Sequence, residues 1–535
     1  MSDSTANGNN LRTYWEGKVQ KNPSKVFLYH DDEVISYGEF DLRVNQAANA
    51  LLDLGIKKGD RVCLILPNTP DFLYCWFGLN KIGGVSVPVN IHFKANEAQY
   101  VVNHCEAVGL IASKEHLEVA LGIRKDCPHL KWISCVGVEA NQLPQGVSSF
   151  KSLCSNMRDG LREFDLNGED LACVIYTSGT TGFPKGVLHV QRTSILAGEA
   201  FVLRAQIDAN DRIMAILPLF HMNAQFYCTW GAIAAEASLI LIRRFSASEF
   251  WSQAVQYGAT EFNFVGTIGT VLCARPQEEF RPEHRIRVAI GAGISPAVYR
   301  TFTERFQIPN VIDAYGMTEV PAVSQNPIGG VIKMKSIGLP AKHPNLLPFS
   351  EMKVVDDYGQ DLPTGAVGEI LVRSPVMMKG YYKEPQKTQE AIRDGWFYTG
   401  DHGYQDNDGY FHFLDRKKDI IRKGGENISA AEVEAVLNEN PRVLESAVIA
   451  VPAELGEDEV MAFIVLRQGQ SITTEEVIDW CKDRLAKFKL PRFIQFRESL
   501  PKTSTERVAK PILKNEEGLV KKAIDVGCYK KLLGL

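Results

Sequence analysis

A stretch rich in glycine and hydroxyl side chains, YTSGTTGFPKG at residues 176–186, constrains this chain more than any other part of it. Glycine allows backbone conformations in which consecutive N–H groups turn toward one anion, while hydroxyls add donors and lysine adds positive charge. A loop of this composition predicts a phosphate-binding site. Its hydroxyl, glycine and lysine residues are Thr177, Ser178, Thr180, Thr181, Gly179, Gly182, Gly186 and Lys185.

The residues on either side predict where the loop lies in the fold. The apolar run at 171–176 predicts a strand, and the residues after the loop predict a helix from about His189. Nucleotide phosphates commonly bind where a strand, a glycine-rich loop and a helix follow one another. The loop lacks the Walker A pattern. The residues alone leave two interpretations open, a phosphate-binding loop or a flexible connection.

Alternating strand and helix patterns run through the first two thirds of the chain. Helical spacing of apolar residues predicts a helix over 37–55, followed by a strand at 61–66, a helix at 71–81 and a strand at 85–89. Further strands are predicted at 213–217, 238–243, 261–265, 288–291 and 311–315. This alternation predicts doubly wound α/β sheets, with ligands bound at the carboxyl ends of the strands.

The pattern changes after residue 329. Alternating apolar and polar residues at 351–356 and 368–373, separated by turns, predict a small β-rich subdomain over about 330–414. A charged stretch with paired glycines follows at 415–429. We therefore expect an N-terminal domain over 1–414, a hinge at 415–418 and a small, mobile α+β domain over 419–535.

Composition excludes several classes of protein. A chain of 535 residues is too long for one core. The 64 acidic and 59 basic residues leave a net charge of −5, which argues against nucleic acid as a partner. The polar first ten residues and the lack of a long apolar run predict neither a signal peptide nor a transmembrane segment. Eleven cysteines without a C-x-x-C pair indicate a reduced, cytoplasmic protein without a zinc cluster.

Four further motifs follow the loop in a fixed order: YGMTE at 315–319, YTGD at 398–401, DRKKDIIRKGGENIS at 415–429 and PKTSTERVAK at 501–510. Together with the loop they resemble the signature motifs of the adenylate-forming enzymes, which include acyl-CoA synthetases, luciferases and peptide-synthetase adenylation domains. Stretches at 66–83, 245–251 and 422–429 are most similar to crotonobetaine/carnitine-CoA ligases and related acid-CoA ligases. The resemblance spans essentially the whole chain.

This resemblance implies a reaction in two steps. A carboxylic acid attacks the α-phosphate of ATP to give acyl-AMP and pyrophosphate, and CoA then takes the acyl group and releases AMP. Because an anion must approach an anion, catalysis depends on positioning and positive charge. Mg²⁺ needs few protein ligands, so Glu319 is the expected metal ligand. The implied catalytic residues are Glu319, Thr318, Lys185 and Arg507, and the implied adenine and ribose contacts are Tyr315, Gly316, Asp401 and Arg416.

The resemblance also implies sites for the acyl group and for CoA. The hinge residue would be Lys418, and the loop Lys423, Gly424, Gly425 and Glu426 would line the CoA tunnel. The implied acyl pocket consists of His221, Phe226, Tyr227, Trp230, Phe264, Gly266, Gly291, Ala292, Gly293 and Val320. The helical spacing of Phe226, Tyr227 and Trp230 fits either a packing face or an aromatic wall that holds a quaternary ammonium group.

One motif departs from the family. Glu506 and Arg507 stand where the family has glycine and its catalytic lysine, so Arg507, Lys502 and Lys510 all remain candidates for that role. Arginine keeps the charge but not the shape of an ammonium. Two alternatives stay open: transfer to a carrier protein instead of CoA, and a nucleotide-binding protein without turnover. The acid is not specified, a carnitine- or crotonobetaine-like acid and a short-to-medium chain acid being the candidates, and a homodimer is one candidate assembly.

Overall fold

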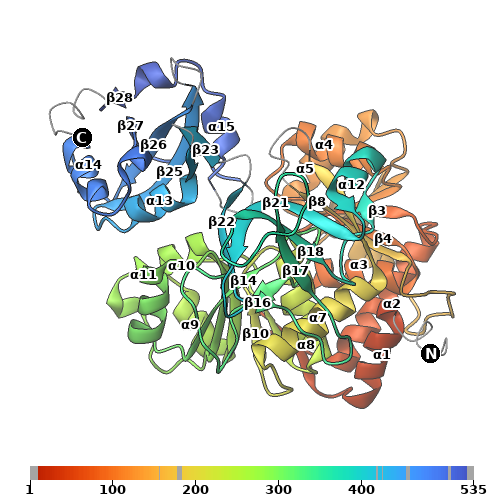
Figure 1. The fold of residues 1–535 in the computed structure, drawn as a ribbon. Coiled ribbons are helices and arrows are strands. Elements are labelled where there is room, and N and C mark those ends of the chain that lie inside the picture. Colours follow the sequence, from red (N-terminus) through yellow and green to blue (C-terminus); the bar gives the residue numbers. More distant parts are fainter. Residues whose placement is uncertain are drawn as a thin grey trace. The chain divides into compact units, whose positions relative to one another are not determined.

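The computed structural model of the chain describes residues 10–155, 157–177, 184–416, 420–423, 426–452, 458–503 and 508–526. They form two compact units, whose elements are labelled in Figure 1. The first unit contains the described residues up to Met352 together with Val372–Phe397. The second contains Lys353–Leu371 together with the described residues from Tyr398 onward. The domain boundaries expected near 414 and 418 stay predictions, because residues 417–419 lie outside the described ranges.

The first unit contains an eight-stranded sheet in the order β19–β9–β8–β4–β3–β5–β6–β7. Strands β8, β4, β3, β5, β6 and β7 pair in parallel, whereas β9 is antiparallel to β8 and to β19. The strands are β3 (Arg61–Ile65), β4 (Val85–Pro88), β5 (Gly109–Ser113), β6 (Trp132–Val136), β7 (Val147–Ser149), β8 (Leu171–Thr177), β9 (Lys185–Val190) and β19 (Gly380–Tyr381).

The first unit also contains a nine-stranded sheet in the order β16–β15–β14–β13–β12–β10–β11–β1–β2. The run from β14 to β1 is parallel, and β2, β15 and β16 pair antiparallel at the edges. The strands are β1 (Val26–His30), β2 (Glu33–Ser36), β10 (Arg212–Ala215), β11 (Ser238–Leu241), β12 (Glu261–Val265), β13 (Val288–Ala292), β14 (Asn310–Tyr315), β15 (Ser324–Gln325) and β16 (Leu339–Pro340). The five predicted central strands are therefore confirmed.

Helices pack against both sheets through one shared hydrophobic core. This core contains Leu64 of the eight-stranded sheet, Ile213 of the nine-stranded sheet and the apolar faces of the helices between them. Helices α4 and α5 pack in a second core that contains Val85 and Leu110. The helices are α1 (Leu11–Lys21), α2 (Tyr37–Asp53), α3 (Pro70–Lys81), α4 (Ala95–His104), α5 (Leu117–Ile123), α6 (Phe150–Ser155), α7 (Gln191–Ala205), α8 (Trp230–Ala234), α9 (Phe250–Tyr257), α10 (Gly266–Cys273), α11 (Pro296–Arg300) and α12 (Pro385–Ala391).

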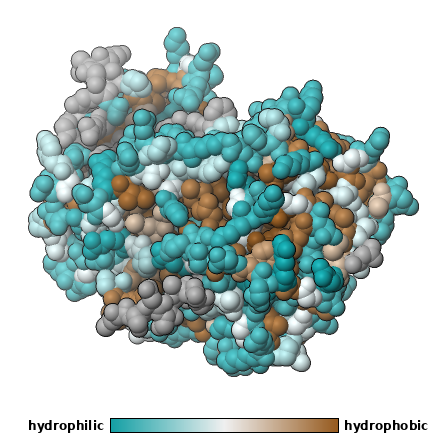
Figure 2. Space-filling view, turned by 90° about the vertical axis from the view of Figure 1, so that its right-hand side faces the viewer, coloured by the Kyte–Doolittle hydropathy of each residue, from teal (hydrophilic) through white to brown (hydrophobic). Residues whose placement is uncertain are grey.

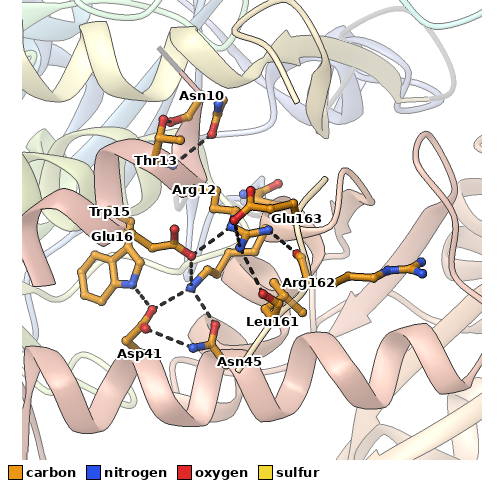
Figure 3. A network of polar contacts seen from close by, with 12 residues as sticks. Asn10, Arg12, Thr13, Trp15, Glu16, Asp41, Asn45, Leu161, Arg162 and Glu163 are labelled. Carbon is orange, nitrogen blue, oxygen red and sulfur yellow. Dashed lines mark hydrogen bonds and ion pairs between the residues drawn. The ribbon is translucent and has the colours of Figure 1, made fainter. Parts of the chain in front are cut away.

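A buried lysine joins the first three helices. Figure 3 shows its partners Glu16, Asp41 and Asn45 in one polar network. Lys81 of α3 is only 2% exposed and lies 2.8 Å from carboxylate oxygens of both Glu16 and Asp41. It also donates to the side-chain oxygen of Asn45 at 2.7 Å, and the indole of Trp15 donates to Asp41 at 2.7 Å. A buried charge is tolerated only when it is paired and hydrogen-bonded. The network therefore fixes α1, α2 and α3 in one arrangement.

The structure corrects the helix that we predicted from about His189. Residues Lys185–Val190 form strand β9, and helix α7 begins only at Gln191. The strand has a partner on each side, because β9 pairs with β8 and with β19, and Val187 and Val190 are buried β-branched residues. The glycine-rich loop therefore connects two antiparallel strands.

One carboxylate of the nine-stranded sheet is fully buried. Glu261 begins β12, and neither of its carboxylate oxygens has a hydrogen-bond partner among the described residues. Burial raises the pKa of Glu261 well above its usual value, Asp211 raises it further, and Arg287 opposes the shift. A carboxyl whose pKa is raised in the folded state binds more protons there than in the unfolded chain. Its effect on stability therefore becomes more unfavourable as pH rises above the unfolded pKa.

We expect Glu261→Gln to stabilise the protein relative to wild type by about 1–3 kcal/mol near pH 8, because the variant has no carboxyl to ionise. The gain should shrink toward pH 5, where the folded-state carboxyl is protonated. Urea unfolding at both pH values measures it. The matched control is Glu278→Gln, since Glu278 is exposed. An equal change at both pH values would contradict the assignment.

The second unit includes most of a β-rich sheet and all of a smaller α+β region. The five-stranded sheet has the order β17–β18–β21–β20 with β22 beside β21, the last sheet has the order β25–β26–β27–β28, and β23 pairs with β24. These strands are β17 (Glu351–Val355), β18 (Gly368–Arg373), β20 (Ile392–Arg393), β21 (Trp396–Gln405), β22 (Phe411–Arg416), β23 (Ile420–Lys423), β24 (Glu426–Ser429), β25 (Val443–Pro452), β26 (Asp458–Leu466), β27 (Phe493–Arg497) and β28 (Ile524–Asp525). The helices are α13 (Ala430–Asn438), α14 (Thr474–Lys482) and α15 (Lys510–Lys514). The predicted fold class is confirmed.

Asp415, near the end of β22, binds the start of α13. Its Oδ2 accepts hydrogen bonds from the backbone N–H of Ala431 at 3.0 Å and from the hydroxyl of Ser429 at 3.2 Å. The same hydroxyl accepts a hydrogen bond from the N–H of Glu432 at 3.2 Å, which caps the helix. Asp415 thus connects β22 to the first turn of α13.

The surface agrees with the polar composition of the chain. On the face drawn in Figure 2, hydrophilic residues cover most of the area and hydrophobic residues appear between them. None of the helices in the part of the chain that the structure describes is long and apolar enough to span a membrane.

Candidate functional site

The two ends of the glycine-rich loop are fixed by the β8–β9 pairing. Thr177 is the last residue of β8 and lies opposite Lys185, the first residue of β9. The predicted phosphate contacts Ser178, Gly179, Thr180, Thr181 and Gly182 lie outside the described residues. The structure therefore places only Thr177 and Lys185 of this predicted set, on facing positions of one hairpin.

Tyr381 contacts both Lys185 and Glu319, the predicted metal ligand. The Tyr381 hydroxyl donates to Oε1 of Glu319 at 2.8 Å, and the Lys185 ammonium lies 4.6 Å from the centre of the Tyr381 ring. Burial, with Glu319 nearby, raises the pKa of the Tyr381 hydroxyl, which therefore stays protonated and acts as a donor. The structure thus joins the loop lysine and the glutamate of YGMTE, both predicted from the sequence, through a tyrosine that was not.

His189 contacts the YGMTE segment, and Tyr227 contacts the chain just after it. Nε2 of His189 lies 2.7 Å from the carbonyl oxygen of Thr318, so Nε2 carries the proton and donates. Burial lowers the pKa of His189 to about 4, so the ring is neutral at pH 7. The Tyr227 hydroxyl accepts from the N–H of Ala322 at 2.7 Å. A side chain at Gly316 would meet that hydroxyl at 3.0 Å, which explains the glycine.

Asp313, just before this segment, is a further carboxylate that sequence reasoning missed. Its two oxygens accept from the N–H groups of Gly293, at 3.0 Å, and Ile294, at 3.2 Å. Burial nevertheless raises the pKa of Asp313 to about 7, because desolvation outweighs these hydrogen bonds. Asp313 therefore changes protonation state near neutral pH at the carboxyl end of β14.

Residues expected around the acyl group gather at the ends of β12 and β13. The register places Phe264 opposite Gly291 and Val265 opposite Ala292. A Cβ at Gly266 would lie 2.6 Å from the carbonyl oxygen of Gly293, so these chain segments approach closely only because position 266 is glycine. The carboxyl edge of the sheet thus brings the predicted pocket glycines together. The acyl-binding role of these residues, and of the fully buried Val320, stays a prediction.

The aromatic stripe does not form one wall. Residues Asn223–Thr229 form a π-helix, whose wider turn changes which side chains share a face. Trp230 is 1% exposed and stacks on Phe77 with ring centres 5.4 Å apart, so it packs in the helix layer and not against a ligand. Phe226 packs edge-on against His189, and Tyr227 supports the YGMTE segment. The structure therefore favours the packing interpretation for Trp230.

His221 lies immediately before the π-helix. Its ring lies 4.6 Å from that of Phe220, and its backbone N–H donates to the carbonyl of Pro218 at 3.0 Å. The side chain is half-buried at the carboxyl end of β10. This position agrees with a residue that faces the acyl group, which stays a prediction.

The second unit contains the predicted ribose contacts. Asp401 is 3% exposed, and its backbone pairs directly opposite Arg416 in the β21–β22 ladder. The turn before Asp401 is fixed by hydrogen bonds from the Gly400 N–H to Glu369 and from the Thr399 hydroxyl to the Ile370 carbonyl. The ladder thus places the backbones of Asp401 and Arg416 opposite each other, and their ribose-binding role stays a prediction.

Two of the three candidates for the catalytic cation have structural partners. Lys502 forms an ion pair with Glu445, and Lys510 lies 2.9 Å from the buried carboxylate of Glu434. Burial raises the pKa of Glu434, whereas Lys510 lowers it, so this pair helps keep the carboxylate charged. Both lysines therefore form ion pairs within the C-terminal region.

The remaining candidate, Arg507, and the hinge residue Lys418 lie outside the described residues, as do Gly424 and Gly425 of the predicted CoA tunnel. Lys423 forms an ion pair with Glu459. The side chain of Glu426 is likewise outside the described part. The hinge and tunnel assignments stay predictions.

Glu319 is the predicted ligand of Mg²⁺, and its surroundings can be compared with those that this metal usually has. No group of three or more His, Cys, Asp or Glu side chains in the described ranges could enclose a metal ion by itself. Glu319 nevertheless presents a half-buried carboxylate, which accepts a hydrogen bond from the tyrosine whose ring contacts Lys185. One carboxylate with substrate phosphates and water is the usual environment of Mg²⁺.

The family models match both parts of the chain. The model described as "AMP-binding enzyme" matches residues 15–382, and the model described as "AMP-binding enzyme C-terminal domain" matches residues 432–507. These ranges include Lys185, Glu319 and Tyr381 in the first and Arg507 in the second.

Curated relatives and solved structures agree with this assignment. The crotonobetaine/carnitine–CoA ligase of Proteus mirabilis is 32% identical over 94% of this chain and 98% of its own length, and that of Salmonella agona is 33% identical over 95% and 99%. The structure resembles an anthranilate CoA ligase with anthranoyl-AMP (TM-score 0.87, 28% identity, 94% and 96% of the two chains). It also resembles ATP-bound MatB from Rhodopseudomonas palustris (TM-score 0.84, 28% identity, 95% and 98%). The chain therefore belongs to the AMP-binding enzyme family and is an ATP-dependent acid-CoA ligase of the acyl-CoA synthetase type.

Proposed function

We propose that this ligase activates a carnitine- or crotonobetaine-like acid, or a short-to-medium chain acid, as acyl-AMP and then transfers the acyl group to CoA. The names of the curated relatives, at 32–33% identity over nearly the whole chain, support the choice of acid. The observation that carries the chemistry is the contact of Lys185 and Glu319 with the same tyrosine. Magnesium as the metal, the cytoplasmic location and a homodimer belong to this proposal.

In the first step, the side chains of the first unit hold the phosphates. Lys185 and the loop hydroxyls, with Thr177 at the β8 end, bind the β- and γ-phosphates, which leave as pyrophosphate. Glu319 would hold Mg²⁺, which would neutralise charge on the phosphate oxygens. Thr318 contacts the α-phosphate, and its backbone is held in place by the hydrogen bond from His189 to its carbonyl.

The nucleoside is oriented by two pairs of residues. Tyr315 and Gly316 contact the adenine, and Asp401 with Arg416 binds the ribose hydroxyls. Arg507 provides positive charge to the attacking carboxylate and the α-phosphate. These contacts convert the encounter of two anions into a positioned, charge-compensated reaction.

In the second step the acyl group moves to sulfur. The thiol of CoA loses its proton to water and attacks the acyl carbonyl, the bond to AMP breaks, and AMP takes the electron pair. Rotation about Lys418 replaces the Arg507 segment with the Lys423–Glu426 loop, which lines the tunnel for CoA. The phosphate-binding residues have no role here, because pyrophosphate has already left.

A panel of acids tests the substrate. We expect AMP formation that requires ATP, CoA and acid together, with kcat/KM for carnitine or crotonobetaine, or for short-to-medium chain acids, about tenfold or more above aryl acids. Glu319→Gln is the matched control that should lose AMP formation with every acid. A preference for aryl acids would overturn the proposed acid class.

The acceptor is tested separately. Carrier protein is offered in place of CoA, and the acyl product is identified by mass. Acylation of the carrier and not of CoA would overturn the proposed acceptor. Absence of pyrophosphate release with every acid would favour a protein that binds nucleotide without turnover.

A further inference from the structure

Tyr381 lies where two separate parts of the site meet. Strand β19 pairs with β9 so that Tyr381 lies opposite Val187, two residues after Lys185. The backbone on both sides is fixed, because Lys379 N–H donates to the Leu188 carbonyl at 2.9 Å and Tyr382 N–H donates to the Gly186 carbonyl at 2.8 Å. Tyr381 is 7% exposed. Its side chain therefore has a fixed place beside the start of β9.

The two polar ends of the site contact different parts of this side chain. Glu319 accepts a hydrogen bond from the hydroxyl at 2.8 Å, and the Lys185 ammonium lies 4.6 Å from the ring centre. The described residues include no ion pair between Lys185 and Glu319. The backbone of Glu319 is fixed as well, since its carbonyl accepts from the N–H of Met378 at 2.7 Å. Tyr381 thus contacts two opposite charges, the ammonium with its ring and the carboxylate with its hydroxyl.

An ammonium and a carboxylate this close to one tyrosine would attract each other strongly if nothing separated them. A direct pair would neutralise the lysine intended for pyrophosphate and the carboxylate intended for the metal. The ring attracts the ammonium through its face, and the hydroxyl donates to the carboxylate. Both charges are therefore partly satisfied while remaining available to a ligand.

We propose that Tyr381 is a positioning residue that keeps Lys185 and Glu319 apart and directs both toward the magnesium complex of ATP. The proposal rests on the roles proposed above for Lys185 and Glu319. It assigns the hydroxyl to the metal side of the site and the ring to the phosphate side. The two functions separate in the variants Tyr381→Phe, which keeps the ring, and Tyr381→Leu, which keeps neither.

Binding of ATP is measured by calorimetry with and without Mg²⁺, in the absence of any acid. Tyr381→Phe should raise the Mg²⁺ concentration needed for half-maximal binding about tenfold and leave the affinity for metal-free ATP within about twofold, as expected from losing one hydrogen bond to a charged group. Tyr381→Leu should in addition weaken metal-free ATP binding several-fold. The rate of acyl-adenylate formation should be lower in Tyr381→Phe than in wild type and lower still in Tyr381→Leu. Thioester formation from supplied acyl-adenylate should be unchanged in both variants.

Tyr382→Phe is the matched control. Tyr382 is the next residue, but its hydroxyl donates to Glu106 at 3.1 Å and contacts neither Lys185 nor Glu319. Tyr382→Phe should keep wild-type values for the Mg²⁺ dependence, for the affinity for metal-free ATP, and for the rates of acyl-adenylate and thioester formation. Thermal unfolding of each variant checks that the fold is retained.

An unchanged Mg²⁺ dependence in folded Tyr381→Phe would overturn the proposal, as would an equal loss of metal-free and metal-bound ATP in that variant. Because the binding experiment uses no acid, it decides the role of Tyr381 even if the proposed acids are wrong. Failure of the acid panel alone would overturn only the substrate class.

Discussion

Glu319→Gln should lower the rate of acyl-adenylate formation by about 10²–10³-fold while thioester formation from supplied acyl-adenylate stays close to wild type. Glutamine keeps the size of the side chain and can still accept the hydrogen bond from Tyr381, so the segment around it should remain in place. Only the negative charge that holds the metal is lost. The loss should therefore appear in kcat for the first step and in the Mg²⁺ dependence.

The two half-reactions are measured by acid-dependent pyrophosphate exchange and by acyl-CoA formation from synthetic acyl-AMP. Glu390→Gln serves as the control, because Glu390 is an exposed acid on the same unit. Equal losses in both half-reactions would mean that residue 319 acts through the fold and not through the metal.

Arg507→Ala is expected to abolish the first step to a similar extent, about 10²–10³-fold, because it removes positive charge from the attacking carboxylate and the α-phosphate. It should spare thioester formation from acyl-adenylate, in which that charge takes no part. Arg507→Lys should retain part of the first step, since it keeps the charge and changes the shape. An unimpaired first step in Arg507→Ala would remove this residue from the mechanism.

Lys502 and Lys510 provide informative controls for this experiment. Each has a carboxylate partner within the C-terminal region, Glu445 and Glu434 respectively. Lys510→Ala would leave the buried Glu434 unpaired, so its main effect should be a lower unfolding temperature. A selective loss of the first step in Lys510→Ala, with the fold intact, would transfer the catalytic role from Arg507 to Lys510.

Periodicity predicted the regular elements well where they are buried on one defined face. The predicted face of α2, with Phe40, Val44, Ala47 and Leu51, is buried, and the Ser36–Glu39 capping box fixes its start. The segment after the loop was assigned wrongly, because KGVLHV carries no strong period in six residues. Its strand conformation depends on pairing with β8, across the loop, and with β19, which lies far away in the sequence.

The residues of the candidate site also divide into those that local motifs indicate and those that only long-range contacts bring together. Lys185 and Glu319 could be predicted because contiguous motifs carry them, and the structure brings both to Tyr381. Tyr381 itself, His189 and Asp313 gave no signal, because their importance comes from contacts across sheets. The aromatic stripe left a packing face and a pocket wall both open, and the stacking of Trp230 on Phe77 favours packing for that residue.

The hydrogen bonds of Asp415 have a consequence for domain rotation. They connect the chain before residues 417–419 to the first turn of α13 after them, so they bridge the expected pivot at Lys418. A rotation that moved α13 away from β22 would break both bonds and leave the N–H of Ala431 without this partner, while the Ser429 cap would stay with the helix. These hydrogen bonds would keep α13 beside β22 during small fluctuations. A full domain rotation would need new hydrogen-bond partners for Asp415 and Ala431. Such a connection favours two discrete orientations of the C-terminal domain over intermediate ones.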